Sequence, residues 1–383
     1  MWMETKTEEE ETRIGHASLS RRALKGLRLF TGDMKHLDEY MQDKYFVLQL
    51  AIWGLRGVTR VILANNPLSG ALIMAALCWQ SPWQGLLGSL GVLASTLTAV
   101  IMGQDRTEVS GGHHGFNGML VSLLMGVFSS AGDWYWWLLL PVCLGSAMCV
   151  FLYSGLSSLL DHWDLPVSVF PFNTIILLYL LCTGSDHPYF PHHPAIPPRA
   201  LVPNDTKLNA VEVIRGIPLG VGQIFVCGAL GPSLLILGAV LLYSPLLAIH
   251  ALLGSAVGTL AGLSMAVNHG YLYSGLSGFN GALACMTIGG LCFTFNWKTH
   301  LFAIASAFIS AYVGIALGNL LGTVGLPVSS WAATLTTTLM LLLTGSLAAY
   351  RIPTAQVMAP EHNLRSHRHC DAGRTREKES TDV

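Results

Sequence analysis

Residues 115–120 read GFNGML and residues 278–283 read GFNGAL, so one glycine-framed Phe-Asn phrase occurs twice, 163 positions apart. Both copies lie inside long apolar stretches. Glycine weakens a helix, so glycines are not expected there by default. The repeated phrase therefore predicts that the chain is built from two related halves.

A fixed shift superimposes much more of the two halves than this phrase. The shift of 163 needs no gap up to GFNG, and it becomes 161 near the end of each half. Chance agreement at glycine, proline and asparagine over such a length is improbable. The matched positions are 57–58 with 220–221, 81–82 with 244–245, 91 with 254, and LPVS at 165–168 with LPVS at 326–329. We interpret the chain as a tandem duplication.

The composition predicts an all-α polytopic membrane protein. Hydrophobic residues make up 52% of the chain and charged residues 11%, against roughly 25% charged in soluble globular domains. Most charges lie near the two ends, and apolar runs of helix length fill the middle. The first forty residues are polar, with EEEETR where a cleavable signal would need an apolar run, so we expect no signal peptide.

The apolar segments divide the chain into five predicted regions. If the pieces before and after Pro82 are one broken helix, each half has five spans, and an odd number forces the second half to enter from the opposite side. We expect two inverted repeats of five transmembrane helices. The regions are a cytosolic tail at 1–40, a first repeat at 41–183, an extracellular loop at 184–209, a second repeat at 210–347 and a cytosolic tail at 348–383.

The distribution of charge predicts the orientation. Lys and Arg are frequent in both tails and sparse in the loop at 184–209, which holds only Arg199 and Lys207. Because cytoplasmic segments carry the excess of basic residues, both termini should be cytosolic. The sequon Asn204-Asp205-Thr206 agrees with an extracellular loop and predicts glycosylation at Asn204, although such a tripeptide is a weak signal.

Phe116 and Leu120 lie four residues apart, as do Phe279 and Leu283, so each pair shares one helix face. Two such faces related by the duplication would form a flat apolar slot at the boundary between the repeats. The glycines beside them would begin or end helices at membrane depth, where free backbone groups must face protein or a watery path. Ordinary helix packing is the other interpretation.

Polar side chains within the apolar runs are further candidates. Arg60 and Gln223 are equivalent under the shift of 163, and so are Gln49 and Glu212. A charge at the centre of a membrane helix costs about 2.5–3.5 kcal/mol on insertion scales, so it should face a pathway or a partner. The alternatives are a snorkelling Arg60, an ion pair between Glu212 and Arg215, and interhelical hydrogen bonds from the glutamines.

Other chemistry is poorly supported. The cysteines lack CxxC pairing and the histidines lie apart or in the predicted loop, so we expect no metal and no cofactor. The sequence NNP at 65–67 is typical of water channels, but its counterpart at 228–230 reads GAL. The apolar runs contain no pairing of a nucleophile with a base, so we predict that the chain is not an enzyme. We expect no nucleic-acid partner.

The chain resembles the eukaryotic urea transporters over about residues 32–347. The resemblance rests on several phrases beside the duplicated GFNG. These are TGDMKHL, LQ at Gln49, NNPLSG, QDR at 104–106, WWLLLPVC, WDLPV followed by PFN, IPLGVGQI, SPL and GLP. The resemblance implies two inverted five-helix repeats, each with a re-entrant pore helix, and a pore within each protomer of a homotrimer.

In that family, urea passes in single file between phenylalanine slots and along backbone carbonyl oxygens, with no coupled ion. By position, Phe116 with Leu120 and Phe279 with Leu283 match the slots, and Gln223 matches one pore mouth. The chain departs from the family at Arg60, where glutamine is expected, because a guanidinium donates but cannot accept hydrogen bonds. It also departs at the pore centre, where Val169 and Ser330 stand in place of threonines.

Together these observations predict a facilitative, channel-like urea transporter in the plasma membrane, with urea and membrane lipid as its partners. An ammonia or water channel, or a channel for another small neutral solute, is the alternative. A proton-coupled transporter using Glu212 is a weaker one, because that carboxylate has no visible relay partner in the sequence.

Overall fold

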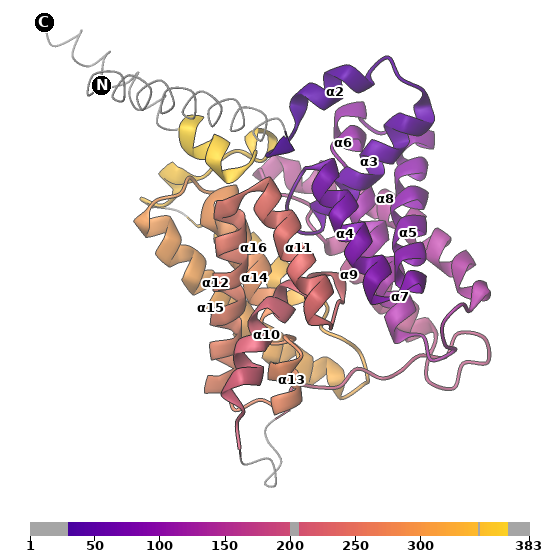
Figure 1. Ribbon diagram of the computed structural model, residues 1–383, viewed down its shortest axis with the longest axis vertical. Helices are drawn as coiled ribbons and strands as arrows, with labels where there is room; N and C mark the ends of the chain where they lie inside the picture. The colour runs from indigo at the N-terminus through magenta and orange to yellow at the C-terminus, as the bar shows by residue number, and fades with distance from the viewer. Residues whose placement is uncertain (1–29, 200–206, 344, 367–383) are drawn as a thin grey trace, which may run out of the picture.

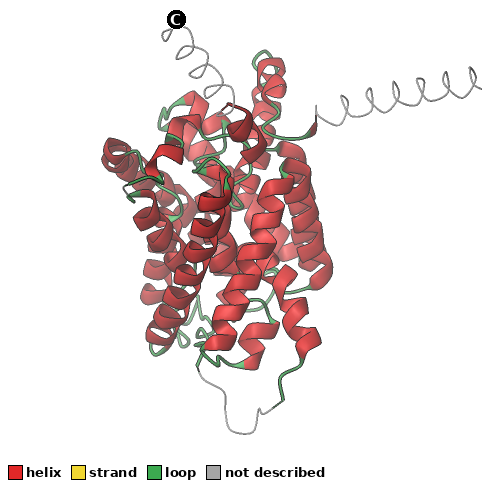
Figure 2. Cartoon of the chain, turned by 90° about the vertical axis from the view of Figure 1, so that its left-hand side faces the viewer, coloured by secondary structure: helices red, strands yellow, loops and turns green. Residues whose placement is uncertain are grey.

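The computed structural model describes residues 30–199, 207–343 and 345–366. Within these ranges the chain is helical, and its only β-structure is a set of isolated bridges. Most helices run along the longest axis of the molecule (Figure 2). Asn204 lies outside the described residues, so its predicted glycosylation stays a prediction.

The helices of the two halves follow the same order. After α2 (Lys35–Met41), the first half contains α3 (Phe46–Arg60), α4 (Pro67–Gln80), α5 (Pro82–Ile101), α6 (Arg106–Ser110), α7 (Gly115–Phe128), α8 (Leu139–Leu160) and α9 (Phe170–Cys182). The second half contains α10 (Ala210–Gly222), α11 (Leu230–Tyr243), α12 (Pro245–Ser264), α13 (His269–Tyr273), α14 (Phe279–Met286), α15 (Trp297–Gly322) and α16 (Trp331–Leu341). Figure 1 shows these two sets side by side.

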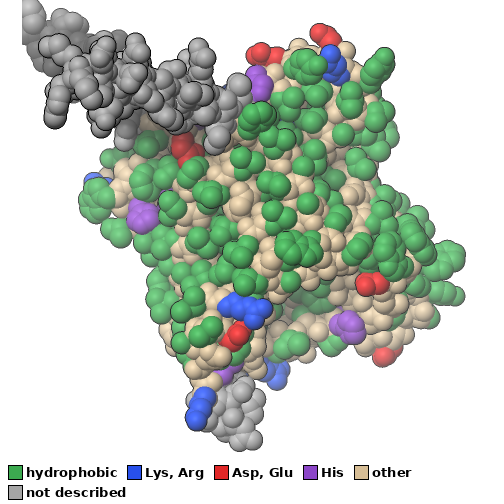
Figure 3. Space-filling model, viewed as in Figure 1, with side chains coloured by type: hydrophobic (Ala, Val, Ile, Leu, Met, Phe, Trp, Pro, Cys, Tyr) green, Lys and Arg blue, Asp and Glu red, His purple; other side chains and the backbone are tan. Residues whose placement is uncertain are grey.

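The helices fit a membrane protein that crosses the bilayer several times. Four described segments are long and apolar enough to cross alone: Pro82–Ile101, Trp136–Trp163, Pro245–Ser264 and Trp297–Gly322. On α8, large apolar side chains are exposed at Leu140, Leu144, Met148 and Phe151, a spacing that covers one helix face. Figure 3 shows a mostly hydrophobic and uncharged flank, with charged side chains toward the two ends.

A helix break lies at Pro82, as the sequence predicts, but it separates two helices. Helix α4 ends at Gln80, and Pro82 is the first residue of α5, whose N-cap Ser81 accepts a hydrogen bond from the Gln84 N–H. A further break lies between α10 and α11, where the axis turns by 74° after Val226. Val226 and its first-half counterpart Leu63 both have positive φ, a backbone state that ends the helix before each.

Equivalent elements of the two halves meet one another near the centre. Helix α4 packs on α11, its counterpart under the shift of 163. Phe170 and Trp331, equivalent under the shift of 161, place their rings 5.9 Å apart. Such self-matching contacts are what a two-fold relation produces. They support the predicted inverted repeats, while the count of five spans per half and the region boundaries stay predictions.

One hydrophobic core joins the halves. It includes Ile73 and Leu87 from the first half, and Ile236 and Leu247 from the second, all essentially inaccessible to solvent. Because lipid tails are as apolar as these side chains, the core stabilises the fold through close van der Waals packing rather than through removal from water. Because the core is continuous, we expect the halves to fold together as one unit.

Candidate functional site

The asparagine of each GFNG phrase holds a loop that enters the interior. Asn117 on α7 donates from Nδ2 to the Ser168 carbonyl over 3.2 Å, and its Oδ1 accepts from the Phe172 N–H over 3.1 Å. Through these two bonds, Asn117 connects α7 to the loop at 165–169 and to the first turn of α9. Asn117 is buried, so these bonds satisfy an amide that would otherwise cost free energy.

The second copy repeats this arrangement. Asn280 Nδ2 donates to the Ser329 carbonyl over 3.2 Å, and its Oδ1 accepts from the Ala333 N–H over 3.2 Å. Ser168 and Ser329 both have positive φ, which is uncommon for a residue with a side chain. From the sequence we predict roles for the Phe, the Leu and the glycines of the phrase, but none for the asparagine. Its signal is a polar residue kept twice in an apolar environment, which indicates a fixed backbone partner.

The glycines of the phrase allow helices to touch through their backbones. A Cβ added to Gly118 would lie 2.6 Å from the Gly91 carbonyl oxygen on α5. In the second half, a Cβ added to Gly281 would lie 2.5 Å from the Gly254 carbonyl oxygen on α12. Larger residues would push α7 from α5 and α14 from α12. The glycines therefore serve close packing, in addition to the predicted start of α7 at Gly115.

The loops at 165–169 and 326–330 meet where the halves join. Asn173 on α9 accepts from the Ser330 N–H over 3.2 Å and donates to Thr334 Oγ1 on α16 over 3.3 Å. Asn173 and Thr334 occupy equivalent positions, so the side chain of one half bonds directly to its counterpart in the other half. This contact fixes the start of α16 against α9.

A cavity of about 1140 Å³ runs between the halves and is lined by both loops. Every side chain that the sequence singled out as a binding residue lines it. They are Arg60, Phe116, Leu120, Val169, Gln223, Phe279, Leu283 and Ser330. The chain thus brings together residues up to 270 positions apart, although their predicted contact with a solute stays a prediction.

The predicted slot residues are paired on the cavity wall. Phe116 is 7% exposed and Leu120 4%, and Phe279 and Leu283 are partly buried beside the same core. The alternative of ordinary packing therefore accounts for much of each side chain's surface. However, all four side chains also line the cavity, where they form an apolar wall, and ordinary packing does not account for that position.

Arg60 and Gln223 make the same contact at opposite ends of the molecule. Arg60 Nε donates to the Gly111 carbonyl over 2.8 Å, just after α6. Gln223 Nε2 donates to the Ser274 carbonyl over 2.9 Å, just after α13. Gly111 and Ser274 are themselves equivalent under the shift of 163. Figure 1 places α6 near α2 and α13 at the far end, so these residues mark two mouths of the cavity.

The two mouths differ in charge. Near Arg60 the lining includes Glu108, Asp161 and Asp164. Near Gln223 the counterpart of Glu108 is Tyr271, and no charged side chain of the described residues lines that mouth. The remaining lining at the Gln223 end is apolar and comes partly from prolines at 194 and 198.

The other polar candidates lie off the cavity. Gln49 donates to the Gln42 and Lys44 carbonyls and accepts from Arg106, so it is used in local structure. Glu212 pairs with Arg215 at 3.5 Å on an exposed helix face, the ion pair that the sequence offered as its alternative role. A transport role for Glu212 gains no support from this position. The described residues hold no group of three or more metal-ligating side chains.

Comparison with known proteins identifies the family. Residues 51–345 match the family model described as urea transporter. The chain is 43% identical to urea transporter 1 of Rattus norvegicus over 361 residues, which is 94% of each chain. It is 42% identical to urea transporter 1 of Ovis aries over 346 residues, 90% of each chain, and 42% identical to that of Mus musculus over 361 residues. These matches confirm the resemblance seen in the sequence, and they name transporters rather than enzymes. The chain belongs to the urea transporter family.

Proposed function

We propose that the protein is a facilitative, channel-like urea transporter that conducts urea down its gradient through a pore within each protomer. The observation that carries the proposal is the single cavity lined by both Phe-Leu pairs, both interior loops and the Arg60 and Gln223 mouths. Membership of the family and the names of the relatives support urea as the solute.

The chemistry of urea matches this lining. Urea is flat, uncharged and rich in N–H donors, so it needs hydrogen-bond acceptors at its rim and apolar groups at its faces. Burying an amide without partners costs about 2–7 kcal/mol. The loops at 165–169 and 326–330 line the cavity, and their carbonyl oxygens, including those of Ser168 and Ser329 that already accept from Asn117 and Asn280, each have a second lone pair for a urea N–H. The phenyl rings of Phe116 and Phe279 provide flat apolar surfaces.

The same lining opposes the passage of ions. A hydrated cation in the narrow apolar section would lose water without gaining a full cage of oxygen ligands. The Arg60 end carries Glu108, Asp161 and Asp164 beside the guanidinium, so the opposition to cations comes from the apolar section. We therefore expect urea flux without a coupled ion.

The wider setting of the pore follows from the charge pattern and the resemblance. We propose that the protein lies in the plasma membrane with both termini cytosolic and the loop at 184–209 outside. The Arg60 mouth then faces the cytosol and the Gln223 mouth the exterior. We further propose the five regions given by the sequence, a homotrimer, and glycosylation of Asn204.

The test is solute flux in proteoliposomes that contain the purified protein. Stopped-flow light scattering would give saturable urea permeability that is unchanged by sodium, by a proton gradient and by membrane voltage. Dependence on any of these would contradict the proposal. If ammonia or water permeability greatly exceeded urea permeability, the alternative of an ammonia, water or other small-solute channel would replace it.

A further inference from the structure

Each half of the chain is followed by a segment without α-helix that begins at an antiparallel bridge, Ser129 with His192 in the first half and Phe293 with Arg351 in the second. The linker strap, residues 191–199, pairs with the end of α7: Ser130 N donates to the Pro191 carbonyl and His193 N to the Phe128 carbonyl. The C-terminal strap, residues 350–357, pairs with the residues after α14: Thr294 N donates to Tyr350 and Ile352 N to Cys292, both over 2.8 Å.

Both straps then cross to the opposite half of the chain and bind there at equivalent residues. Ala195 N of the linker strap donates to the Gly325 carbonyl over 2.8 Å. Thr354 of the C-terminal strap donates from N to Asp164 Oδ1 over 2.9 Å and from Oγ1 to the same oxygen over 2.7 Å. Asp164 and Gly325 are 161 positions apart, and both have positive φ. The straps are therefore reciprocal arms of the duplication.

Each strap lines one mouth of the cavity. Pro194, Ala195, Ile196 and Pro198 line the Gln223 end, and Thr354, Ala355 and Val357 line the Arg60 end. The straps thus determine part of the width of each opening. Cys292 lies beside the C-terminal strap, also lines the cavity, and is 6% exposed.

The two straps are held to the opposite half by different kinds of contact. The linker strap rests on glycines: a Cβ added to Gly322 would lie 2.6 Å from Pro197 Cβ, and one added to Gly318 would lie 3.0 Å from Pro198 Cδ. The first-half counterparts of these glycines are Asp161 and Ser157, which bond to each other over 2.9 Å. The C-terminal strap is held instead by Asp164, which accepts from Thr354 and also pairs with Arg351 at 3.2 Å. The linker strap is held rigidly, because its prolines pack directly on glycines. The C-terminal strap can be released, because it is held by hydrogen bonds to one carboxylate.

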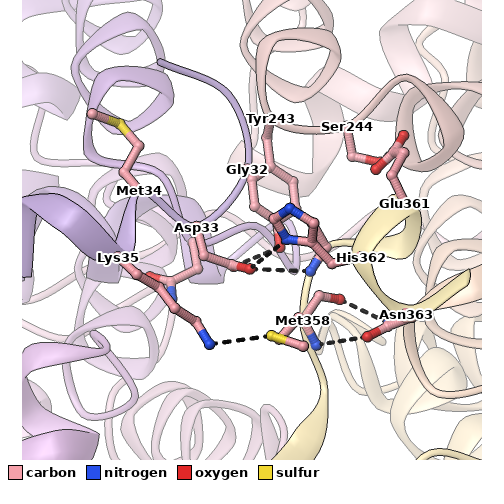
Figure 4. A network of polar contacts seen from close by, with 12 residues as sticks. Gly32, Asp33, Met34, Lys35, Tyr243, Ser244, Met358, Glu361, His362 and Asn363 are labelled. Carbon is pink, nitrogen blue, oxygen red and sulfur yellow. Dashed lines mark hydrogen bonds and ion pairs between the residues drawn. The ribbon is translucent and has the colours of Figure 1, made fainter. Parts of the chain in front are cut away.

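The residues after the C-terminal strap are fixed independently of Asp164. Ala359 N donates to Asp33 Oδ2 over 3.2 Å, and the Tyr243 hydroxyl donates to Asp33 Oδ1 over 3.0 Å (Figure 4). Glu361 accepts from Ser244 Oγ over 2.9 Å. The strap is thus held at its start by the bridge and beyond its end by this network. Its middle is held to the first half by the Asp164 carboxylate, by a hydrogen bond from Arg351 to the Asp164 carbonyl, and by packing of Val357 on the apolar cluster that includes Leu165. Loss of the carboxylate would loosen the middle without detaching the segment.

We propose that the C-terminal strap is a movable wall of the Arg60 mouth that limits the size of the solutes admitted, and that Asp164 is the residue that positions it. The inference rests on the proposed transport function for its solute readout. Its structural part, a strap released by loss of the Asp164 carboxylate, is independent of which solute passes.

The test compares Asp164→Gly with wild type in two measurements. Glycine adopts positive φ without strain and copies Gly325, so the variant removes the carboxylate and keeps the backbone. The first measurement is the rate at which a small thiol reagent modifies Cys292, read by peptide mass spectrometry. We expect an increase of about tenfold or more, because the variant removes two hydrogen bonds from Thr354 to a charged group and the ion pair with Arg351. The second is the permeability ratio of 1,3-dimethylurea to urea, which should rise.

Three controls separate the strap from other effects. Cys149 on α8 is 1% exposed and away from the strap, so its protection in the same sample reports that the fold is intact. Asp161→Asn removes a charge from the same mouth without touching the strap, and should leave Cys292 protected. Asp164→Asn keeps an acceptor for Thr354 and should change both readouts less than Asp164→Gly.

The outcomes are decisive. The proposal is overturned if Asp164→Gly leaves the rate of Cys292 modification unchanged while Cys149 stays protected. It is also overturned if the rate of Cys292 modification rises but the permeability ratio of 1,3-dimethylurea to urea does not. If Asp164→Gly also exposes Cys149, Thr354→Val carries the test by the same criteria, because it removes one bond to Asp164 and keeps the side-chain shape. If wild type fails to conduct urea, the transport proposal fails, and Cys292 modification still decides whether Asp164 holds the strap.

Discussion

The two mouths of the cavity have the same backbone contact and different side chains. Arg60 and Gln223 both donate to a carbonyl at equivalent positions, yet one mouth carries Arg60 and Glu108 and the other Gln223 and Tyr271. Deeper in, Asn117 and Asn280 keep their bonds almost unchanged in length. The duplication has therefore kept the asparagines that hold the loops and the Phe-Leu pairs of the cavity wall, and has let the side chains at the two mouths differ.

The largest effect should come from the asparagines that hold the loops. Asn117→Ala and Asn280→Ala each leave a buried carbonyl and N–H without a partner, at about 1–3 kcal/mol for each group. We expect each variant to lower the melting temperature and to abolish most urea flux. Thermal unfolding in detergent, together with flux per folded protein, measures this. If one variant behaved like wild type, the two halves would not share this role.

The slot residues should have the next largest effect. Phe116→Ala and Phe279→Ala each remove one aromatic face from the cavity wall, and aromatic contacts are worth about 0.5–1.5 kcal/mol beyond their buried area. We expect a loss of urea permeability of about twofold to tenfold, similar for the two variants. Leu120→Ala and Leu283→Ala test the residues behind them. A large loss from one half with no loss from the other would contradict a shared slot.

Exchange at the mouths should have an effect of about the same size as exchange in the slots. Arg60→Gln supplies an acceptor for the urea N–H groups and keeps a donor for Gly111, so urea permeability should rise by about the value of one hydrogen bond, twofold to tenfold. Gln223→Arg should lower it by a similar factor. Stopped-flow urea permeability of both variants checks this. Equal permeability of wild type and Arg60→Gln would show that the guanidinium is neutral to transport.

The smallest effect is expected at the pore centre. Val169→Thr adds the hydroxyl that Ser330 carries in the other half, at nearly unchanged shape. One additional neutral hydrogen bond predicts a gain in urea permeability of about twofold to fivefold, and Ser330→Val predicts a comparable loss. Proteoliposome flux with each variant measures the difference. A decrease on adding the hydroxyl at Val169 would place that side chain away from the passing solute.

Much of the site could be predicted because the duplication is visible in the sequence. Repeated Phe, Leu and loop residues indicate surfaces that meet at a two-fold boundary, and all eight predicted residues line one cavity. The mouth contact of Arg60 could not be predicted, because its partner is the backbone of Gly111, 51 residues away. A backbone carbonyl carries no sequence signal of its own.

The positions of helix breaks were harder to predict than the helices. Proline indicates a break at Pro82, and the structure has one there, because Pro82 stands in the first turn of a new helix, α5. The break between α10 and α11 could not be predicted, because it follows Val226, whose positive φ is disfavoured for its residue type. The straps were missed for a related reason: their seats are made by glycines and one aspartate that a sequence shows as ordinary loop residues.

The central claim is that one conduit is lined by equivalent residues of both halves. The most direct test uses two single variants, Leu120→Cys and Leu283→Cys, each treated with a small methanethiosulfonate reagent. Stopped-flow urea permeability is measured before and after treatment, and treated wild type is the reference. We predict that modification at either position blocks urea flux to the same residual level. Flux that persists after complete modification at one position, with block at the other, would contradict a conduit shared by the two halves.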